Sequence, residues 1–405
     1  MTTTFEALLA PLSTALKNQG KAIDAQTGSE KLTFETFVRV LMFGFCIGST
    51  SLRRLVAELA SNLDADALGL PVLCRSTLKD GFTRFRAHHF ETLYKYLLTQ
   101  IESMGVTDKL LSNIGLLKVI DGSIFPLIKS MEWGEFRTKH KALKIHMELC
   151  INTLCVTNYV IQAGNSDERK ALMTMIDSAV TYICDRGYFS FAVANRIHEL
   201  GAFFVMRLKK NYATTLVQNL VLTGQIPACF THVADRLVYF TNNPLQTEAS
   251  IFRIVSFRVL KTHFIICTNR TDLTTLQIML LYAYRWQIEL FFKYLKRAIH
   301  GIHLFSNGQN GSKVYLHLLL CFVLLQLNLK QKCHKIVNNT SAEILCTTTN
   351  DETMTKEWYI ATDWVYDMGL KFKQLFKMSM DWLTYLKNSI AQLTDYQVIT
   401  KLATL

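Results

Sequence analysis

The sequence predicts an α/β protein in which a sheet-bearing centre is flanked by helical regions at both ends of the chain. Helix-spaced apolar positions run from Thr33 to about Ile101, short β-rich runs begin near Leu116, and a long helical stretch starts at Thr274. Strands that alternate with helices in the middle of a chain are typical of a mixed α/β core.

The composition indicates a folded chain with a basic surface. Of 405 residues, 50% are hydrophobic and 19% are charged, which is enough for two or three domains with their own cores. The formal net charge is +12 and the pI is near 9.1, which favours DNA, RNA or an anionic membrane as partner. The ten cysteines include no Cys-x-x-Cys pair, so we expect reduced thiols in a cytoplasmic protein, nucleoid-associated in a prokaryote.

A membrane protein is a weaker alternative. Residues 1–20 lack the segments of a secretory signal. The apolar run Val314–Leu329, together with the mean hydropathy of +0.17, is what suggests a membrane span. The run contains His317 and Gln326 and falls short of the roughly 20 residues that span a bilayer. We therefore expect a buried helix and no membrane partner.

The N-terminal region is expected to be helical and to bind DNA. One apolar stripe comprises Phe34, Phe37, Val38, Leu41 and Phe45. A second helix is expected over residues 51–60, and Ser76 is the expected N-cap of a third. The segment from Ser76 to Arg86 is basic, which fits either DNA recognition or an ordinary solvated face.

Two aspartates end strand-like runs in the centre of the chain. Asp121 ends LLKVID and Asp185 ends TYICD, and a helix is expected over residues 189–200. Each aspartate taken alone is typical of a turn or cap. Further strand-like segments over residues 209–271 predict a β-rich insertion before the helix that begins at Thr274.

That helix carries an unusual set of polar residues. On an ideal helix Tyr282, Arg285, Glu289 and Lys296 fall within one sector of about 60°. Apolar neighbours indicate that much of the helix is buried, so the polar stripe would face a binding site. The alternative is an intrahelical ion pair, because Arg285 and Glu289 are spaced i,i+4.

The three acidic residues suit metal-dependent phosphodiester chemistry. Asp121, Asp185 and Glu289 would supply hard oxygen ligands, and Mg²⁺ completes its shell with water and phosphate. Two such ions, about 3.5–4 Å apart, stabilise both the attacking and the leaving oxygen of an in-line displacement. We expect Mg²⁺ as the cofactor, with Mn²⁺ able to substitute.

These residues resemble the DDE transposases of the insertion-sequence-four type. The family hallmark Tyr-x2-Arg-x3-Glu-x6-Lys is present from Tyr282 to Lys296, and VIDGSIFPL and CDRGYFS resemble the segments around the first and second catalytic aspartates. The stretch with Lys144 and His146 also resembles a segment of the family, and so does AGNSDERKAL with Asp167. The resemblance covers roughly residues 70–330.

The resemblance implies a ribonuclease H-like catalytic core with a β-rich insertion. It implies cut-and-paste transposition through hairpin ends, in which Asp121, Asp185 and Glu289 are catalytic metal ligands. It also implies a homodimer bound to transposon ends and target DNA. The expected DNA-binding residues are Tyr282, Arg285, Trp286, Lys293, Lys296 and Arg186.

The chain departs from the family in its insertion, which has no tryptophan to stack on a flipped base. Phe230, Tyr239 and Phe240 are the aromatic candidates, although each also fits a core position. The hairpin step therefore rests on the family alone.

The expected domains follow these changes of pattern. They are a helical DNA-binding domain over residues 1–110, the first part of the catalytic core over 111–208, the insertion over 209–272, the second part of the core over 273–332, and a helical region over 333–405. The last region fits dimer contacts or simple packing onto the core. Two rival functions share these features: a catalytically inactive, domesticated DNA-binding relative, and a nuclease without strand transfer.

Overall fold

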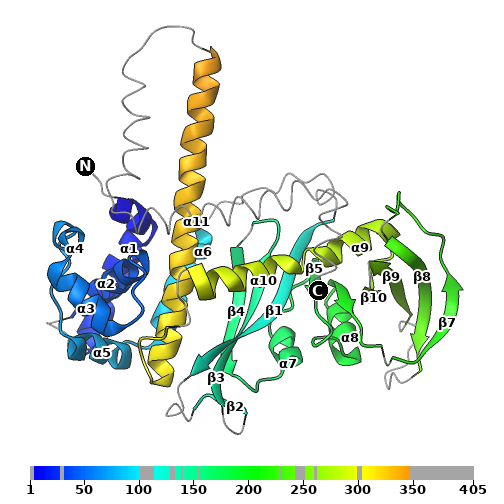
Figure 1. Ribbon diagram of the computed structural model, residues 1–405, viewed down its shortest axis with the longest axis horizontal. Helices are drawn as coiled ribbons and strands as arrows, with labels where there is room; N and C mark the ends of the chain where they lie inside the picture. The colour runs from blue at the N-terminus through cyan, green and yellow to red at the C-terminus, as the bar shows by residue number, and fades with distance from the viewer. Residues whose placement is uncertain are drawn as a thin grey trace. The chain divides into compact units, whose positions relative to one another are not determined.

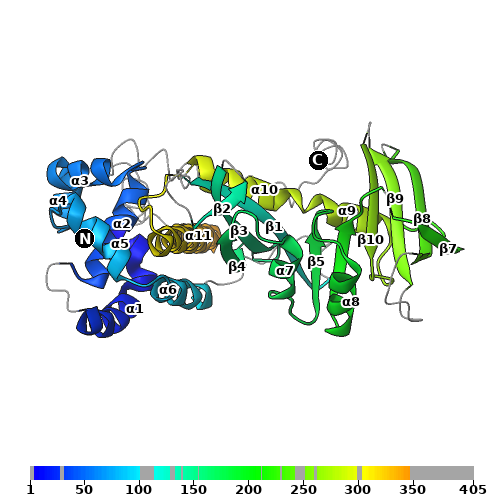
Figure 2. The same cartoon turned by 90° about the horizontal axis from the view of Figure 1, so that it is seen from below.

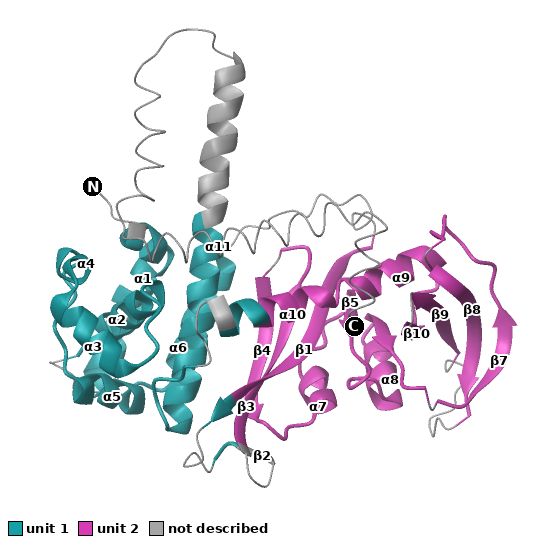
Figure 3. Ribbon diagram, in the orientation of Figure 1, with its two compact units in different colours: residues 1–102, 126–134, 293–383 teal, residues 103–125, 135–292, 384–405 magenta. Residues whose placement is uncertain are grey.

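The computed structural model describes most of the chain up to Cys346. The described residues are 4–27, 32–100, 114–127, 133–137, 140–153, 155–210, 212–228, 230–241, 251–259, 262–298 and 303–346. They belong to two compact units, the first from residues 1–102, 126–134 and 293–383, the second from 103–125, 135–292 and 384–405 (Figure 3). The expected C-terminal helical region lies outside the described residues beyond Cys346.

The first unit is helical, as expected for the N-terminal region. Its helices are α1 (Thr4–Thr27), α2 (Phe34–Cys46), α3 (Leu52–Ser61), α4 (Leu63–Ala67), α5 (Arg75–Arg84), α6 (Ala87–Thr99), the π-helical turn η2 (Tyr294–Ala298) and α11 (Gln309–Cys346). The predicted apolar stripe of α2 is buried, and its rings pack against α5 and α6, with Phe37 5.1 Å from Phe82 and Phe34 5.0 Å from Phe90.

The helix starts in this unit test the capping predictions. Thr33 and Ser51 cap α2 and α3 through their hydroxyls, as N-cap residues do. The prediction that Ser76 caps the next helix is wrong, because α5 begins at Arg75 with Cys74 at the N-cap position. The Ser76 hydroxyl instead lies inside the first turn, 3.0 Å from the Cys74 sulfur.

Helix α11 contains the apolar run that raised the membrane question. Within the described residues, Gln309–Leu329 is long and apolar enough to cross a membrane, and 89% of its 18 most apolar consecutive residues are buried inside the protein. It packs against α6, α1 and α2. A mostly buried helix of this kind is what the sequence predicted, and it is the ordinary behaviour of a core helix.

The second unit is built on one mixed sheet of ten strands (Figure 1). The strands are β1 (Leu116–Leu127), β2 (Glu135–Arg137), β3 (His140–Cys150), β4 (Cys155–Ala163), β5 (Val180–Cys184), β6 (Phe203–Arg207), β7 (Thr214–Asn219), β8 (Phe230–Phe240), β9 (Phe252–Val259) and β10 (Thr262–Thr268). The order is β2-β3-β1-β5-β6-β10-β9-β8-β7, and β4 pairs with β3.

The centre of this sheet confirms the α/β prediction. Strands β3 and β4 form an antiparallel pair, whereas β1, β5 and β6 are parallel. The order β4-β3-β1-β5-β6 is the ribonuclease H-like arrangement that the family resemblance implied. Strands β7 to β10, from the β-rich segment, extend the same sheet beyond β6 through antiparallel pairs.

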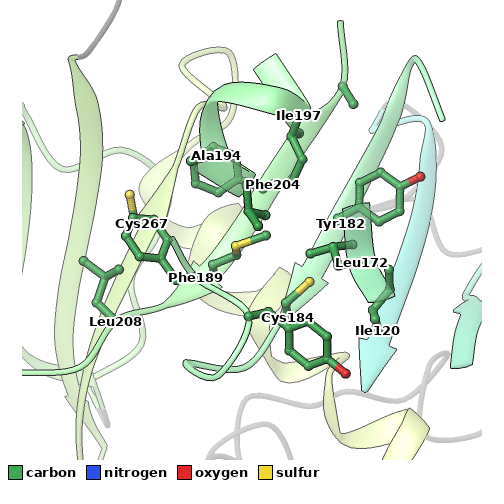
Figure 4. Packing of buried hydrophobic residues seen from close by; sticks show 14 of the residues in the cluster. Ile120, Leu172, Tyr182, Cys184, Phe189, Ala194, Ile197, Phe204, Leu208 and Cys267 are labelled. Carbon is green, nitrogen blue, oxygen red and sulfur yellow. The ribbon is translucent and has the colours of Figure 1, made fainter. Parts of the chain in front are cut away.

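Helices cover both faces of the parallel strands (Figure 2). One face packs against α7 (Glu168–Met173) and α8 (Phe191–Glu199) through a buried cluster that includes Ile120, Cys184 and Phe204 (Figure 4). On the other face, α9 (Thr275–Ala283) contacts β5, β6 and β9. Because both faces are covered, β5 is fully buried, as parallel strands usually are.

The long helix predicted from Thr274 to about His300 is interrupted, so that prediction is wrong in its continuity. Helix α9 starts at a capping box made by Thr274 and Gln277 and ends at Ala283. Helix α10 (Trp286–Lys293) follows, and η2 continues from it. The break and the wider π turn change the angle between successive residues, so the ideal 60° sector does not hold.

Candidate active site

Two of the predicted site residues stand on neighbouring parallel strands. The pairing of β1 with β5 ends at Ile120 and Cys184. Asp121 and Asp185 are the next residues in the sequence after these two. Asp185 directly follows β5, as predicted. The prediction that Asp121 ends its strand is wrong, since β1 continues to Leu127 beside β3. Both aspartates nevertheless lie at the carboxyl edge of the parallel strands, where α/β sheets commonly hold their ligands.

Arg285 links these strands to the helix that carries the third acidic residue. Its guanidinium lies 2.6 Å from the Glu289 carboxylate and 3.8 Å from that of Asp121. Arg285 is 5% exposed, and its Nε is buried without a hydrogen-bond partner among the described residues. The i,i+4 ion pair expected as the alternative is therefore present, and it forms part of a site rather than a solvated face.

Tyr282 connects α9 to the second aspartate. Its side chain is fully buried, and its hydroxyl lies 3.2 Å from Asp185 Oδ1. Because the ring is held by the core, the hydroxyl is fixed in direction. Burial and the negative charge of Asp185 raise the pKa of Tyr282, while Arg285 opposes this rise, so Tyr282 stays a hydrogen-bond donor at neutral pH.

The electrostatics of the site reflect crowded carboxylates. Burial raises the pKa of Asp121 to about 6, and the charges of Asp185 and Glu289 add to the rise. Arg285 and the Gly122 N–H, 2.8 Å from Asp121 Oδ1, act in the opposite direction. Burial therefore disfavours the charged form of Asp121, and a further cation beside it would favour that form.

A second polar cluster supports the strand that bears Asp121. Lys144 pairs with Glu168 at 2.7 Å. The buried His146 lies 3.2 Å from both the Tyr188 and the Ser166 hydroxyls. A Cβ at Gly122 would lie 2.9 Å from Lys144 Cε and 3.0 Å from His146 Nδ1, so the backbone beside Asp121 packs closely on this cluster.

Lys144, His146 and Asp167 were predicted only as positions that resemble the family, and no role was predicted for Glu168, Tyr188 or Gly122. Asp167 is the N-cap of α7, which aims the next residue, Glu168, at Lys144. No spacing rule connects these positions, because the contacts join different elements. A glycine directly after a strand aspartate was the only local signal.

The donor chemistry of the three carboxylates fits a hard divalent cation. Asp121, Asp185 and Glu289 offer only oxygen atoms, the ligands that Mg²⁺ and Mn²⁺ prefer. In the described part of the chain, no three His, Cys, Asp or Glu side chains are arranged so that they could hold a metal ion together. In the described geometry Arg285 is the cation that partners Glu289, so metal ligation by Glu289 would replace that ion pair.

The remaining predicted DNA-binding residues are distributed over both units. Arg186 is exposed directly after Asp185, and Trp286 is half-buried at the start of α10. Lys293 and Lys296 belong to the first unit, where Lys293 is exposed and partial burial lowers the pKa of Lys296. These residues keep their expected roles as predictions.

The aromatic candidates of the insertion differ in exposure. Phe230 and Phe240 are buried core residues, whereas Tyr239 is 36% exposed on β8. Of the three, only the Tyr239 ring is accessible to a base.

Asp121 and Asp185 at adjacent strands and Glu289 on α10, paired with Arg285 just before that helix, form an acidic triad in a protein of the mixed α/β class. Comparison with known proteins identifies the family. Residues 116–325, more than half of the chain, match the family described as Transposase DDE domain. The chain therefore belongs to that family.

Individual relatives agree with this membership. A protein of Sinorhizobium fredii (strain NBRC 101917 / NGR234), named as transposase y4zB, is 26% identical over 203 residues, which cover 50% of this chain and 57% of the relative. A protein of Geobacillus stearothermophilus, named as the transposase for insertion sequence element IS5377, is 21% identical over 209 residues, covering 51% and 54%. The match spans little more than half the length of each relative.

Among solved structures, the piggyBac transposase synaptic complex with hairpin DNA aligns over 100% of this chain and 86% of its own. The TM-score is 0.46 and the sequence identity is 10%.

Proposed function

We propose that this protein is an insertion-sequence transposase that cuts DNA at the ends of its element and joins the freed ends to target DNA. The observation that carries the proposal is the convergence of Asp121, Asp185 and Glu289 around the buried Arg285. Family membership and the names of the relatives support the same reading. We also propose that the protein is of the insertion-sequence-four type, that it acts as a homodimer on DNA, and that it transfers the element by cut-and-paste through hairpin ends.

In this proposal the three carboxylates hold divalent metal ions. Bound Mg²⁺ or Mn²⁺ would supply Lewis-acid activation of the attacking and leaving oxygens. Asp121 and Asp185 are presented by neighbouring strands that are hydrogen-bonded to each other, which fixes the spacing of their backbones. Tyr282 donates a hydrogen bond from its hydroxyl to Asp185 and thereby limits the rotation of that carboxylate.

Arg285 would have two alternating partners. In the described structure it neutralises Glu289 and lies near Asp121. A guanidinium released from Glu289 would be able to bind a DNA phosphate through its planar fork. Tyr282, Trp286, Lys293, Lys296 and Arg186 complete the proposed set of DNA contacts.

The test is cleavage of DNA that carries the gene's own flanking inverted repeats. Wild-type protein and Glu289→Gln are incubated with Mg²⁺, and the products are resolved on denaturing gels. We expect nicks at the element ends, followed by hairpin or joined products, with wild-type protein only. Glu289→Gln preserves the shape of the side chain, so equal binding of DNA by both proteins would show that only chemistry was lost.

Other outcomes would redirect the proposal. End binding without cleavage by wild-type protein would favour the DNA-binding relative without catalysis. Cleavage without any joined product, at every Mg²⁺ and Mn²⁺ concentration, would favour a nuclease.

A further inference from the structure

A group of basic side chains gathers at one end of the extended sheet, outside the acidic triad. It consists of Arg207, Lys209, Lys210, His232, Arg258 and His263, which we call the basic rim. All six belong to the second unit. Lys209, Lys210, His232, Arg258 and His263 are exposed, and Arg207 is half-buried.

The topology of the sheet explains why the residues of the basic rim lie at the same end of their strands. Strand β6 is parallel to β5, and Lys209 and Lys210 follow its C-terminal end. Strand β10 is antiparallel to β6, so its beginning, with His263, lies at the same edge. Arg258 near the end of β9 pairs in register with His263 and with Thr231 of β8, which precedes His232. Figure 1 shows β10, β9 and β8 side by side in this order.

The proposed catalytic aspartates lie at this same end of the strands. Cys184 and Met206 are register partners, so the following residues, Asp185 and Arg207, stand at the same level on adjacent strands. The Arg207 guanidinium lies 4.5 Å from the centre of the Phe264 ring, and that ring is 6.0 Å from Tyr282, which contacts Asp185. A continuous line of contacts therefore joins the basic rim to the acidic triad.

The cations of the rim are close enough to act on one another. The pKa of His263 is lowered, first by partial burial and then by the charges of Arg258, Lys210, His232 and Arg207. Among the described residues, no carboxylate forms an ion pair with any member of the rim, whereas Arg253 and Arg270 on the same strands and turns are fully paired. Cations left unpaired beside one another favour a polyanion.

We propose that the basic rim binds the phosphate backbone of the DNA whose scissile bond lies at the acidic triad, so that the insertion strands hold the flanking duplex. This inference rests on the proposed function for the identity of the polyanion. DNA is the partner favoured here because the rim continues the edge on which the carboxylates lie, and phosphates are what these cations would neutralise.

The test compares the full-length protein with a charge-reversed rim. In Lys210→Glu/Arg258→Glu both changes are at exposed positions and leave the core intact. The matched control is Arg236→Glu, an exposed arginine of β8 in register with Ile254, which lies about 13 Å along β9 from Arg258. Affinity is measured by fluorescence anisotropy with a labelled 40-base-pair duplex.

We expect the rim variant to lose affinity at least tenfold and the control to stay within twofold of wild type. In wild-type protein, hydrogen exchange of peptides from β6 and from the β9–β10 hairpin should slow when DNA is added. The neutral variant Lys210→Ala/Arg258→Ala should show a smaller loss in the same direction. Unchanged affinity of both rim variants, or unchanged exchange in these peptides, would overturn the inference.

The failure of this inference and that of the proposed function can be told apart. If wild type cleaves and the rim variants bind and cleave like wild type, the rim has no such role while the transposase proposal stands. If wild type binds DNA through the rim but never cleaves, the rim assignment stands and the catalytic proposal fails.

Discussion

At the scale of single residues, Gly122 decides how closely Asp121 can approach its supporting strand. A Cβ there would meet Lys144 and His146, and both side chains are held by other partners. We expect Gly122→Ala to lower the free energy of unfolding by about 1–3 kcal/mol, as overpacking usually does. Cleavage should fall with it, because the backbone of Asp121 must shift.

Urea unfolding monitored by circular dichroism checks this prediction. Gly20→Ala is the matched control, because its added Cβ would find its nearest atoms only at 4.0 Å and alanine suits the interior of α1. Equal stability of Gly122→Ala and wild type would contradict the packing argument.

A substitution at Tyr282 can separate the contribution of the buried ring to stability from the contribution of the hydroxyl to the site. Tyr282→Phe keeps the ring and removes the donor to Asp185, so the free energy of unfolding should change by no more than about 1.5 kcal/mol. DNA cleavage should nevertheless fall by about tenfold or more, because Asp185 loses the group that orients it.

The control for this variant is Tyr239→Phe, which removes a hydroxyl from an exposed ring on β8. Cleavage rates and urea unfolding curves for both variants provide the comparison. Unchanged cleavage by Tyr282→Phe would remove the positioning role.

At the scale of elements, the acid sensitivity of α11 follows from its buried histidine. Burial lowers the pKa of His317 to about 4, and the charges of Lys313 and Lys95 add to this against the opposing effect of Glu91. In the unfolded chain the pKa is near 6.5, so between about pH 4 and 6.5 the unfolded state binds more protons. The stability of the first unit should therefore be complete above about pH 6.5 and decrease as the pH falls towards 4.

We would measure urea unfolding of α11 by pulsed hydrogen exchange and mass spectrometry at pH 7.5 and pH 5. His317→Leu should reduce the difference between the two conditions, whereas replacement of the exposed His88 by Gln should not. A difference that persists in His317→Leu would assign the acid sensitivity to other groups.

The helices also show which structural features can be predicted from short-range sequence patterns. The buried stripe of α2 was predicted, because the spacing of its apolar residues is local, whereas the N-caps Thr33 and Ser51 were not. The interruption between α9 and α10 was not predicted either, since Tyr284 and Arg285 are compatible with helix. Tertiary contacts lie on both sides of the break, where Tyr282 packs against Phe264 of β10 and Arg285 lies between the carboxylates of Asp121 and Glu289.

At the scale of the whole molecule, the net charge of +12 should govern the affinity for DNA. Neutralised phosphates release counterions, so the logarithm of the binding constant should fall linearly with the logarithm of salt concentration. With about six or more phosphate contacts, affinity should drop by about 10³-fold or more between 50 and 200 mM salt. Anisotropy titrations over this range check it, and a flat dependence would exclude backbone binding as the main source of affinity.

The sequence by itself determined the class of most of the larger elements and singled out the acidic residues as candidates for the site. Both depend on local order: the period of apolar residues selects helix or strand, and the spacing from Tyr282 to Lys296 needs no knowledge of the fold.

Only the tertiary structure decided which groups meet. Asp121 and Asp185 become neighbours through the register of β1 with β5, and Arg285 reaches Asp121 across more than 160 positions of sequence. The extension of the sheet by the insertion strands likewise places Arg207, Lys210, Arg258 and His263 at one edge. Such contacts depend on strand pairing between distant segments, and the free energy of that pairing comes from burial of the shared core rather than from any local pattern.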